Sequence, residues 1–293
     1  SRSLGSGNKL INFDLIMPLP ENYTVSCSGD SAMGNVRKNN EDRLSFYDLE
    51  GRKTLYLKGA EASTSGKGIV LMVNDGMGGA NAGEIASKIA ADAILRKIEE
   101  ESPDHPETDE KKVLDVLQQA FQFAHQEINQ TAHAQRLHKG MGTTSTCLWF
   151  TGSKAWLAQV GDSRLYRIRD NEIQQLSEDQ TPVWELVVDG EITEEEARKH
   201  PDRNLLHQAL GAGIEHIKAV CQRVDVREED VFLLCTDGLS DALPRETLKT
   251  IVTQNAHGNL PAACRYMIHR ADTEYGQDNI TVAMARIRAS SPA

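Results

Sequence analysis

The sequence lacks the features that mark several common classes of protein. Its longest apolar runs, such as Gly-Ile-Val-Leu-Met-Val at 68–73, are too short to cross a bilayer, and nothing near the start reads as a signal peptide. Lys and Arg number 32 against 43 Asp and Glu, a formal net charge of -11 with no evident basic face. We therefore expect no membrane or nucleic-acid partner, and a cytoplasmic location is the default expectation.

Cysteine or histidine pairs with metal-binding spacing are also missing. The five cysteines are odd in number and widely spaced, with no C-x-x-C pair, and four of them lie in apolar or mixed runs that predict reduced core residues. None of the nine histidines is paired at the spacing of a helical zinc site, and His125, His133 and His138 are interpreted as solvated polar positions. These absences argue against zinc.

The 293 residues show no internal repeat and no shift in composition that would divide the chain. Residues 1–10 are rich in Ser and Gly, so residues 1–22 are interpreted as an N-terminal extension or a cloning remnant. Apolar residues repeat at the helical period from residue 81 to 100 and from about 111 to 137, which predicts a helix hairpin. Further short helices are expected within 181–213, near 244–256 and at 260–272.

Strand patterns dominate the rest of the sequence. An edge strand is predicted at 23–29, a second strand at 42–47, a polar hairpin or loop at 51–68 and a buried strand at 69–74. Four strands within 143–177 are joined by short turns and predict an antiparallel meander. The remaining strands are expected at 216–224, 230–236 and 279–287. This order favours an α+β fold in which two mainly antiparallel sheets pack as a β-sandwich flanked by helices.

Carboxylates recur at the ends of the apolar strands, each close to a Gly or a small polar residue. Taken alone, each could be an ordinary turn residue, because Asp is common in turns. Neighbouring carboxylates repel one another by roughly 1 to 4 kcal/mol, and a hard divalent cation such as Mg²⁺ or Mn²⁺ would remove that cost. Gly76 leaves its carbonyl open to such an ion. The positions are Glu41, Asp42, Asp75, Asp162, Asp237 and Asp278.

Six motifs in order resemble the bacterial branch of the type 2C metal-dependent protein Ser/Thr phosphatases, the PPM family. They are RKNNED, VNDGMGGANAGE, GMGTTSTCL, AQVGDSRLYRIR, LLCTDGLSDAL and GQDNITVAMARI, and they extend across about residues 23–288. The resemblance implies a catalytic domain over 23–290, with a flap subdomain at about 178–213. It also implies a two-metal site at one end of the sandwich that hydrolyses phosphoserine and phosphothreonine.

Position by position, the resemblance implies that Asp75 bridges two Mn²⁺ or Mg²⁺ ions and that the Gly76 carbonyl binds one of them. Asp237 and Asp278 would complete the second site. Glu41 and Asp42 match acids that hold metal-bound waters, and Arg37 matches the phosphate-binding arginine. Asp162 would share a third, weaker ion with Asp237.

Three positions depart from the family pattern. Met77 and Ala80 stand where many relatives carry His near the D-G-x-G-G motif, and Gln180 stands at another position where His is frequent. A side-chain general acid is therefore unavailable at these places. The metal-ligand positions are unaffected.

Two other functions remain compatible with the sequence. The chain could be a catalytically silent member of the fold that acts as a binding or scaffold module, although such proteins usually lose the acids that are present here. It could also be a phosphatase dedicated to a small molecule or one regulatory partner. The leading expectation is a monomeric enzyme that acts on phosphorylated Ser/Thr proteins and opposes a cognate kinase.

Overall fold

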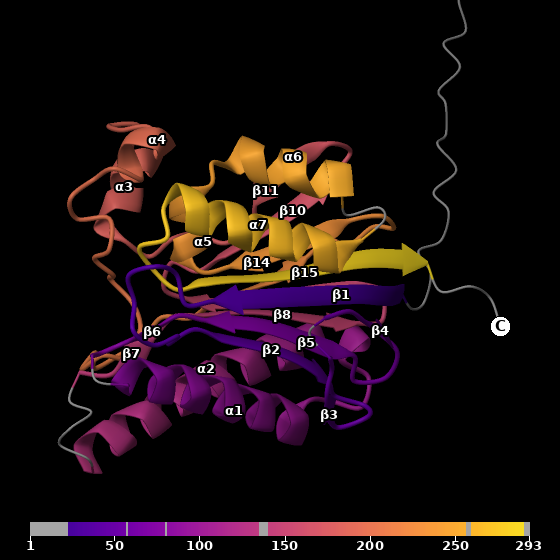
Figure 1. Cartoon of the computed structure of the whole chain (residues 1–293). Helices are drawn as coiled ribbons and strands as arrows, with labels where there is room; N and C mark the ends of the chain where they lie inside the picture. The colour runs from indigo at the N-terminus through magenta and orange to yellow at the C-terminus, as the bar shows by residue number, and fades with distance from the viewer. Residues whose placement is uncertain (1–22, 57, 80, 135–139, 256–258, 290–293) are drawn as a thin grey trace, which may run out of the picture.

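The computed structural model describes residues 23–56, 58–79, 81–134, 140–255 and 259–289. Two six-stranded sheets pack face to face, and helices cover the outer face of each (Figure 1). All strand pairs within these described ranges are antiparallel. The predicted α+β sandwich is confirmed, whereas the proposed 1–22 extension lies outside the described residues.

The first sheet has the strand order β11-β10-β14-β15-β1-β4. Its members are β1 (Tyr23–Ala32), β4 (Ala60–Ser63), β10 (Arg164–Arg169), β11 (Glu172–Gln175), β14 (Val231–Cys235) and β15 (Ile280–Ala289). The second sheet has the order β13-β9-β8-β5-β2-β3. It consists of β2 (Arg43–Asp48), β3 (Lys53–Thr54), β5 (Ile69–Asn74), β8 (Ser145–Thr151), β9 (Lys154–Val160) and β13 (Val220–Val224).

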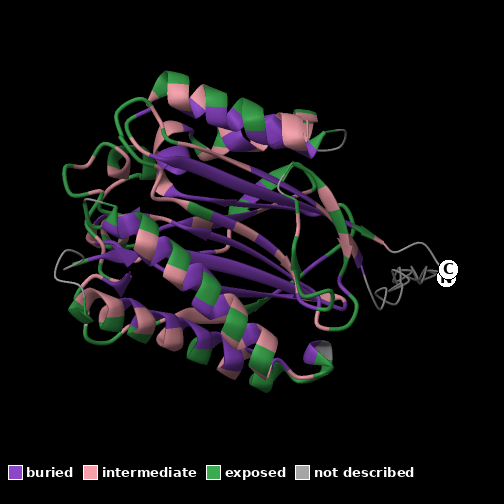
Figure 2. Ribbon diagram, turned by 60° about the horizontal axis from the view of Figure 1, so that its bottom comes forward, coloured by how far each residue is buried: buried purple, intermediate pink, exposed green. Residues whose placement is uncertain are grey.

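Helices α1 (Ala82–Glu101) and α2 (Glu110–Ala134) lie against the second sheet, with the short η1 (Pro106–Thr108) between them. Helices α5 (Asp237–Ala242), α6 (Arg245–Asn255) and α7 (Leu260–Glu274) cover the first sheet. Figure 2 shows their exposed residues on the outer side and their buried residues toward the strands. Among the described helices, none has the length and apolar content needed to span a membrane.

Side-chain alternation along β5 explains why all six of its residues are buried. Ile69, Leu71 and Val73 belong to the core between the two sheets. Val70 and Met72 face the other way and join the core beneath α1 and α2. Because both faces of the strand are covered, its sequence is continuously apolar instead of alternating.

Three predictions about individual strands were wrong. The strand at 23–29 is not at an edge of its sheet, because β4 pairs with β1 on its outer side. The segment 51–68, which was predicted as a hairpin or loop, contributes that strand β4. The four strands within 143–177 do not form one meander, because β8 and β9 lie in one sheet and β10 and β11 in the other. The chain crosses between the sheets at 161–163.

A small third sheet, β12-β7-β6, lies beside the ends of the large ones. It consists of β6 (Gly76–Met77), β7 (Gly142–Thr143) and β12 (Leu210–Gly211). His125 on α2 is buried at 2% exposure, and its Nδ1 accepts a hydrogen bond from the Gly211 N–H at 3.0 Å. The prediction that His125 is solvated was therefore wrong. Burial lowers its pKa. His133 is exposed as predicted, and His138 lies outside the described residues.

The segment 178–213 contains α3 (Pro182–Val188) and α4 (Glu194–Ala197) before it reaches β12. Thr193 and Glu196 form the capping box that the sequence predicts. Glu194 pairs with Arg245 of α6, and the Arg203 guanidinium donates to the Tyr275 hydroxyl at 2.9 Å. These contacts hold the segment against the helices of the first sheet, and its boundaries as a flap subdomain stay a prediction.

Candidate metal centre

Antiparallel pairing brings the acids of the second sheet together at one end. Arg43 at the start of β2 pairs with Asn74 at the end of β5. Asp42 precedes that strand start and Asp75 follows that strand end. The pairing register of β2 and β5 therefore places Asp42 close to Asp75.

The first sheet supplies carboxylates at the same end. Cys235 at the end of β14 pairs with Val282 near the start of β15, so Asp237 and Asp278 flank the same edge. Asp162 lies where the chain passes from β9 to β10, between the two sheets. The acids that follow apolar strands in the sequence therefore meet across the sandwich.

A cavity of about 440 Å³ opens at this end. Its polar lining includes six of the predicted site side chains and the backbone of Gly76; the six are Arg37, Glu41, Asp75, Asp162, Asp237 and Asp278. Asp42 is the exception and does not line the cavity. Its Oδ2 instead accepts a hydrogen bond from the Thr236 hydroxyl at 2.9 Å, directly before Asp237.

The carboxylates raise one another's pKa values. Burial raises the pKa of Asp75 well above its usual range, and the negative charge of Asp237 adds to the effect. Burial and the Asp237 carboxylate also raise the pKa of Asp162 well above its usual range. Burial raises the pKa of Asp42 to about 7. Such mutual repulsion is what a bound cation would relieve.

The donor set fits a hard divalent cation. Asp42 Oδ1 and Asp237 Oδ1 are buried and lack a hydrogen-bond partner within the described part of the chain, an arrangement that opposes folding unless a ligand or an ion contacts them. Every candidate donor is an oxygen atom, which suits Mg²⁺ or Mn²⁺. Within the described ranges, no three His, Cys, Asp or Glu side chains already converge on one point. Side-chain rotation would be needed to surround an ion.

An ion pair at Asp278 is one reason why the acidic side chains do not converge on one point. One of its oxygens, Oδ2, lies 2.6 Å from the Arg37 guanidinium in an ion pair. The Arg37 side chain is 50% exposed, while that of Asp278 is 24% exposed. The arginine occupies the carboxylate that the sequence assigns to a metal, so an arriving cation would compete with Arg37 for Asp278.

Close backbone packing accounts for Gly76. A Cβ at this position would lie 2.2 Å from the Gly83 carbonyl oxygen and 2.6 Å from the Glu41 carbonyl oxygen. The first turn of α1 therefore packs directly onto β6, and a side chain would separate them. This packing is a reason for glycine in addition to the expected carbonyl ligand, whose role stays a prediction.

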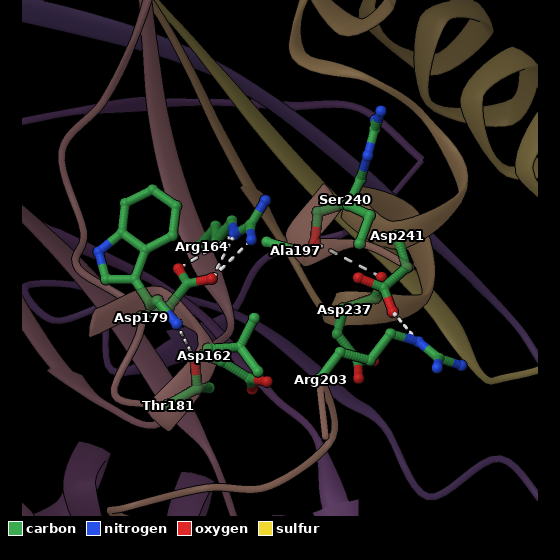
Figure 3. A pocket seen from close by; sticks show the side chains of 12 residues that line it. Asp162, Arg164, Asp179, Thr181, Ala197, Arg203, Asp237, Ser240 and Asp241 are labelled. Atoms are coloured by element: carbon green, nitrogen blue, oxygen red, sulfur yellow. Dashed lines mark hydrogen bonds and ion pairs between the residues drawn. The ribbon is translucent and has the colours of Figure 1, made fainter. Parts of the chain in front are cut away.

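Figure 3 shows a second cluster beside the cavity, which adds Arg164, Asp179, Arg203 and Asp241 to the predicted residues Asp162 and Asp237. The Arg164 guanidinium holds Asp179 with hydrogen bonds of 2.6 to 3.0 Å, and Arg203 Nε lies 3.4 Å from Asp241 Oδ2. Asp162 and Asp237 line this small pocket of about 30 Å³ as well as the larger cavity. Burial raises the pKa of Asp241 to about 7, and the Asp237 charge contributes.

A sequence signal for Asp241 exists, because it follows Asp237 by four residues and α5 places both on one helical face. Arg164 and Arg203 carry no comparable signal, since their partners are 15 and 38 residues away. Their roles depend on tertiary contacts.

Solved structures share this architecture. The catalytic domain of the serine/threonine protein phosphatase PstP, determined in complex with two manganese ions, matches with a TM-score of 0.72 and 30% identity. The match covers 90% of this chain and 99% of that one. The architecture is therefore that of the serine/threonine protein phosphatases.

Sequence comparison gives the family. Residues 59–280 match the family described as Protein phosphatase 2C, and the chain belongs to that family. Serine/threonine phosphatase stp of Listeria innocua is 31% identical over 251 residues, covering 86% of this chain and 91% of the relative. PstP of Mycobacterium tuberculosis is 35% identical over 262 residues, covering 88% of this chain. This chain spans 44% of that mycobacterial protein's length.

Proposed function

We propose that this chain hydrolyses phosphoserine and phosphothreonine in proteins with the help of two Mn²⁺ or Mg²⁺ ions. The observation that carries the proposal is the cavity in which carboxylates from both sheets meet beside an accessible arginine. Membership of the Protein phosphatase 2C family supports it, and so does the manganese-bound relative.

We assign the metal ligands to Asp75, Asp237, Asp278 and the Gly76 carbonyl, with Glu41 and Asp42 holding water around the ions. The raised pKa values of Asp75 and Asp237 support this assignment, because a cation converts their mutual repulsion into attraction. When bound, the ions would supply Lewis acidity that activates water and neutralises phosphate charge. Asp162 is proposed to share a third, weaker ion with Asp237.

Arg37 is proposed to bind the phosphate. Its guanidinium is half exposed at the cavity and is planar, so it can donate two parallel hydrogen bonds to phosphate oxygens. Release from Asp278 would make both donors available. Arg37 then orients the phosphate while the carboxylates hold the ions.

Neither of the departures from the family pattern within the described residues supplies a proton. Met77 has no ionisable group, and the Gln180 amide donates to the Lys218 carbonyl at 3.1 Å. In our proposal, the proton that the leaving Ser or Thr alkoxide needs would therefore come from a water molecule held at the metal centre.

The test is turnover of phosphothreonine peptides and of a generic aryl phosphate by the purified chain, with and without Mn²⁺ after exhaustive chelation. We expect turnover only when the ion is restored, and loss of turnover in Asp75→Asn. Asp92→Asn on the exposed face of α1 is the matched control. Peptide binding without turnover under every metal condition would favour a silent scaffold, whereas turnover after thorough metal removal would contradict the mechanism.

The finer assignments belong to the same proposal. A bacterial, cytoplasmic enzyme that opposes a Ser/Thr kinase fits the relatives' names. We also propose that the chain acts as a monomer. Size-exclusion chromatography with light scattering tests that statement directly.

A further inference from the structure

The main cavity has a second, apolar part to its lining. Alongside the carboxylates and Arg37 it contains a group of uncharged side chains, which we call the apolar wall: Met77, Leu205, Leu206, Ala209, Ala212 and Ile214. Leu205 is 54% exposed, and the wall's other large members, Met77, Leu206 and Ile214, are only partly buried. Large aliphatic side chains in a cavity rich in carboxylates are not there to stabilise the core.

The apolar wall belongs to a different structural unit from the acids. The acids follow or precede strands of the two large sheets, whereas Met77 lies in β6 of the small third sheet and the remaining wall residues lie in the segment 205–214, which flanks β12 of that sheet. The Ala212 N–H donates to the Met141 carbonyl at 2.7 Å, and the Ile214 N–H donates to the Gly211 carbonyl at 3.0 Å. The first bond holds the Ala212 end of the wall against Met141, directly before β7, and the second closes a turn that carries Ile214.

A peptide whose phosphate reaches Arg37 must pass its neighbouring residues over the rest of the cavity lining. In the proposed function the carboxylates Asp75, Asp237 and Asp278 hold the ions that face the phosphate, so the peptide's neighbouring residues are left to the other part of the lining. Aliphatic neighbours would cover exposed carbon atoms of Leu205 and Leu206, which removes apolar surface from water. The polar part of the lining thus favours the phosphate, and the apolar wall favours the side chains beside it.

We infer that the apolar wall selects phosphopeptides with a large aliphatic side chain directly beside the phosphorylated residue. This inference rests on the proposed function and narrows its substrate class. Met77 contributes a flexible aliphatic surface, so the wall can accommodate side chains of different shape.

The experiment compares two phosphothreonine peptides of equal length and charge, one with Leu and one with Gln on both sides of the phosphothreonine. We expect kcat/KM with Mn²⁺ to favour the Leu peptide by roughly tenfold, the size of effect that one or two methylenes in an apolar pocket produce. Leu205→Asn should reduce that ratio to about twofold. The control is Val188→Asn, which changes a 63% exposed apolar residue of α3 outside this cavity and should leave the ratio unchanged.

The ratio of kcat/KM between the Leu and Gln peptides distinguishes a failure of this inference from a failure of the proposed function. If neither peptide is hydrolysed with Mn²⁺, the proposed function fails. If both peptides are hydrolysed with equal kcat/KM, the proposed function is supported and the selective role of the apolar wall is overturned. Ile214→Asn provides a second variant if Leu205→Asn does not fold. A Leu preference that survives both substitutions would also overturn the inference, because the preference would then arise elsewhere.

Discussion

Gln180 and Gly161 exchange two hydrogen bonds. The Gln180 side-chain Oε1 accepts from the Gly161 N–H at 2.8 Å, and the Gln180 N–H donates to the Gly161 carbonyl at 3.1 Å. Gly161 has a φ of 101° and directly precedes Asp162 at the crossing between the sheets. The residue that replaces a frequent histidine therefore braces the turn that carries a proposed metal ligand.

Gln180→Ala should weaken this brace. The Gly161 N–H is buried, and leaving it without an acceptor should lower the free energy of unfolding by about 1 to 3 kcal/mol. We also expect kcat to fall several-fold, because Asp162 loses its fixed position. Urea unfolding and steady-state kinetics measure both effects. Gln119→Ala on the exposed face of α2 is the control, and equal stability of the two variants would contradict the bracing role.

Asp162→Ala should lower kcat at least tenfold and remove a low-affinity phase from the Mn²⁺ titration of activity. The fold should not suffer, because the change deletes a buried carboxyl whose pKa burial raises well above normal. Asp170→Ala is the contrasting variant. Asp170 has a φ of 51° in a surface turn, so alanine there should reduce stability and leave activity per folded molecule unchanged. If Asp162→Ala shows that second pattern, Asp162 is a turn residue.

Arg37→Ala should raise KM for phosphopeptides by roughly tenfold or more while Mn²⁺ binding is retained. The variant removes the cation that occupies Asp278 in the metal-free protein, so Mn²⁺ affinity by calorimetry should be equal or higher. Lys38→Ala changes the exposed neighbour as a control. Loss of Mn²⁺ binding in Arg37→Ala would show that the arginine holds the site together.

Metal-free protein should become less stable as the pH rises from about 4 to 7. Burial raises the pKa of Asp42 to about 7, whereas an unfolded aspartate titrates near about 3.9. Below both pKa values the folded and unfolded states both hold the proton, and between them only the folded state holds it. The free energy of unfolding therefore falls as the pH rises, by on the order of 4 kcal/mol. Asp42→Asn should flatten the profile measured by urea unfolding, and Asp92→Asn should not. Parallel profiles for wild type and Asp42→Asn would refute the shift.

Gly76→Ala should destabilise the protein far more than Gly79→Ala. The new methyl group at 76 would overlap the Gly83 carbonyl, whereas one at 79 meets nothing within 4 Å and adds only the strain of a φ of 61°. We expect a loss of at least about 3 kcal/mol for the first and about 1 kcal/mol for the second. Thermal unfolding in the absence of metal isolates this packing effect. Similar losses for both variants would mean that α1 can move away from β6.

The sequence predicts the clustering of acids because strand ends are visible in local patterns. Asp42 and Asp75 adjoin apolar runs, and antiparallel pairing then places them together without further information. The family resemblance added the expectation of a two-metal site at one end of the sandwich. The parts that local patterns could predict are therefore the strands and the end at which the site forms.

Tertiary pairing explains what the sequence could not predict. The strand β4 has an ordinary polar sequence and becomes a strand only by pairing with β1. The alternation of apolar and polar residues does not indicate which sheet a strand joins. The passage of the chain from one sheet to the other at 161–163 could therefore not be predicted. His125 lies on an amphipathic helix whose neighbour β12 comes from a distant segment, so its burial depended on a contact 86 residues away.

The long pair formed by β1 and β15 separates the site from the ends of the described chain. Tyr23 pairs with Ala289 at one end of the ladder, and Ala32 pairs with Ile280, two residues after Asp278, at the other. Ten paired residues extend about 30 Å. Fluorophores, surface linkers or fused proteins attached at residue 289 would therefore leave the cavity entrance open. Immobilised enzyme and single-molecule measurements can be built on this geometry.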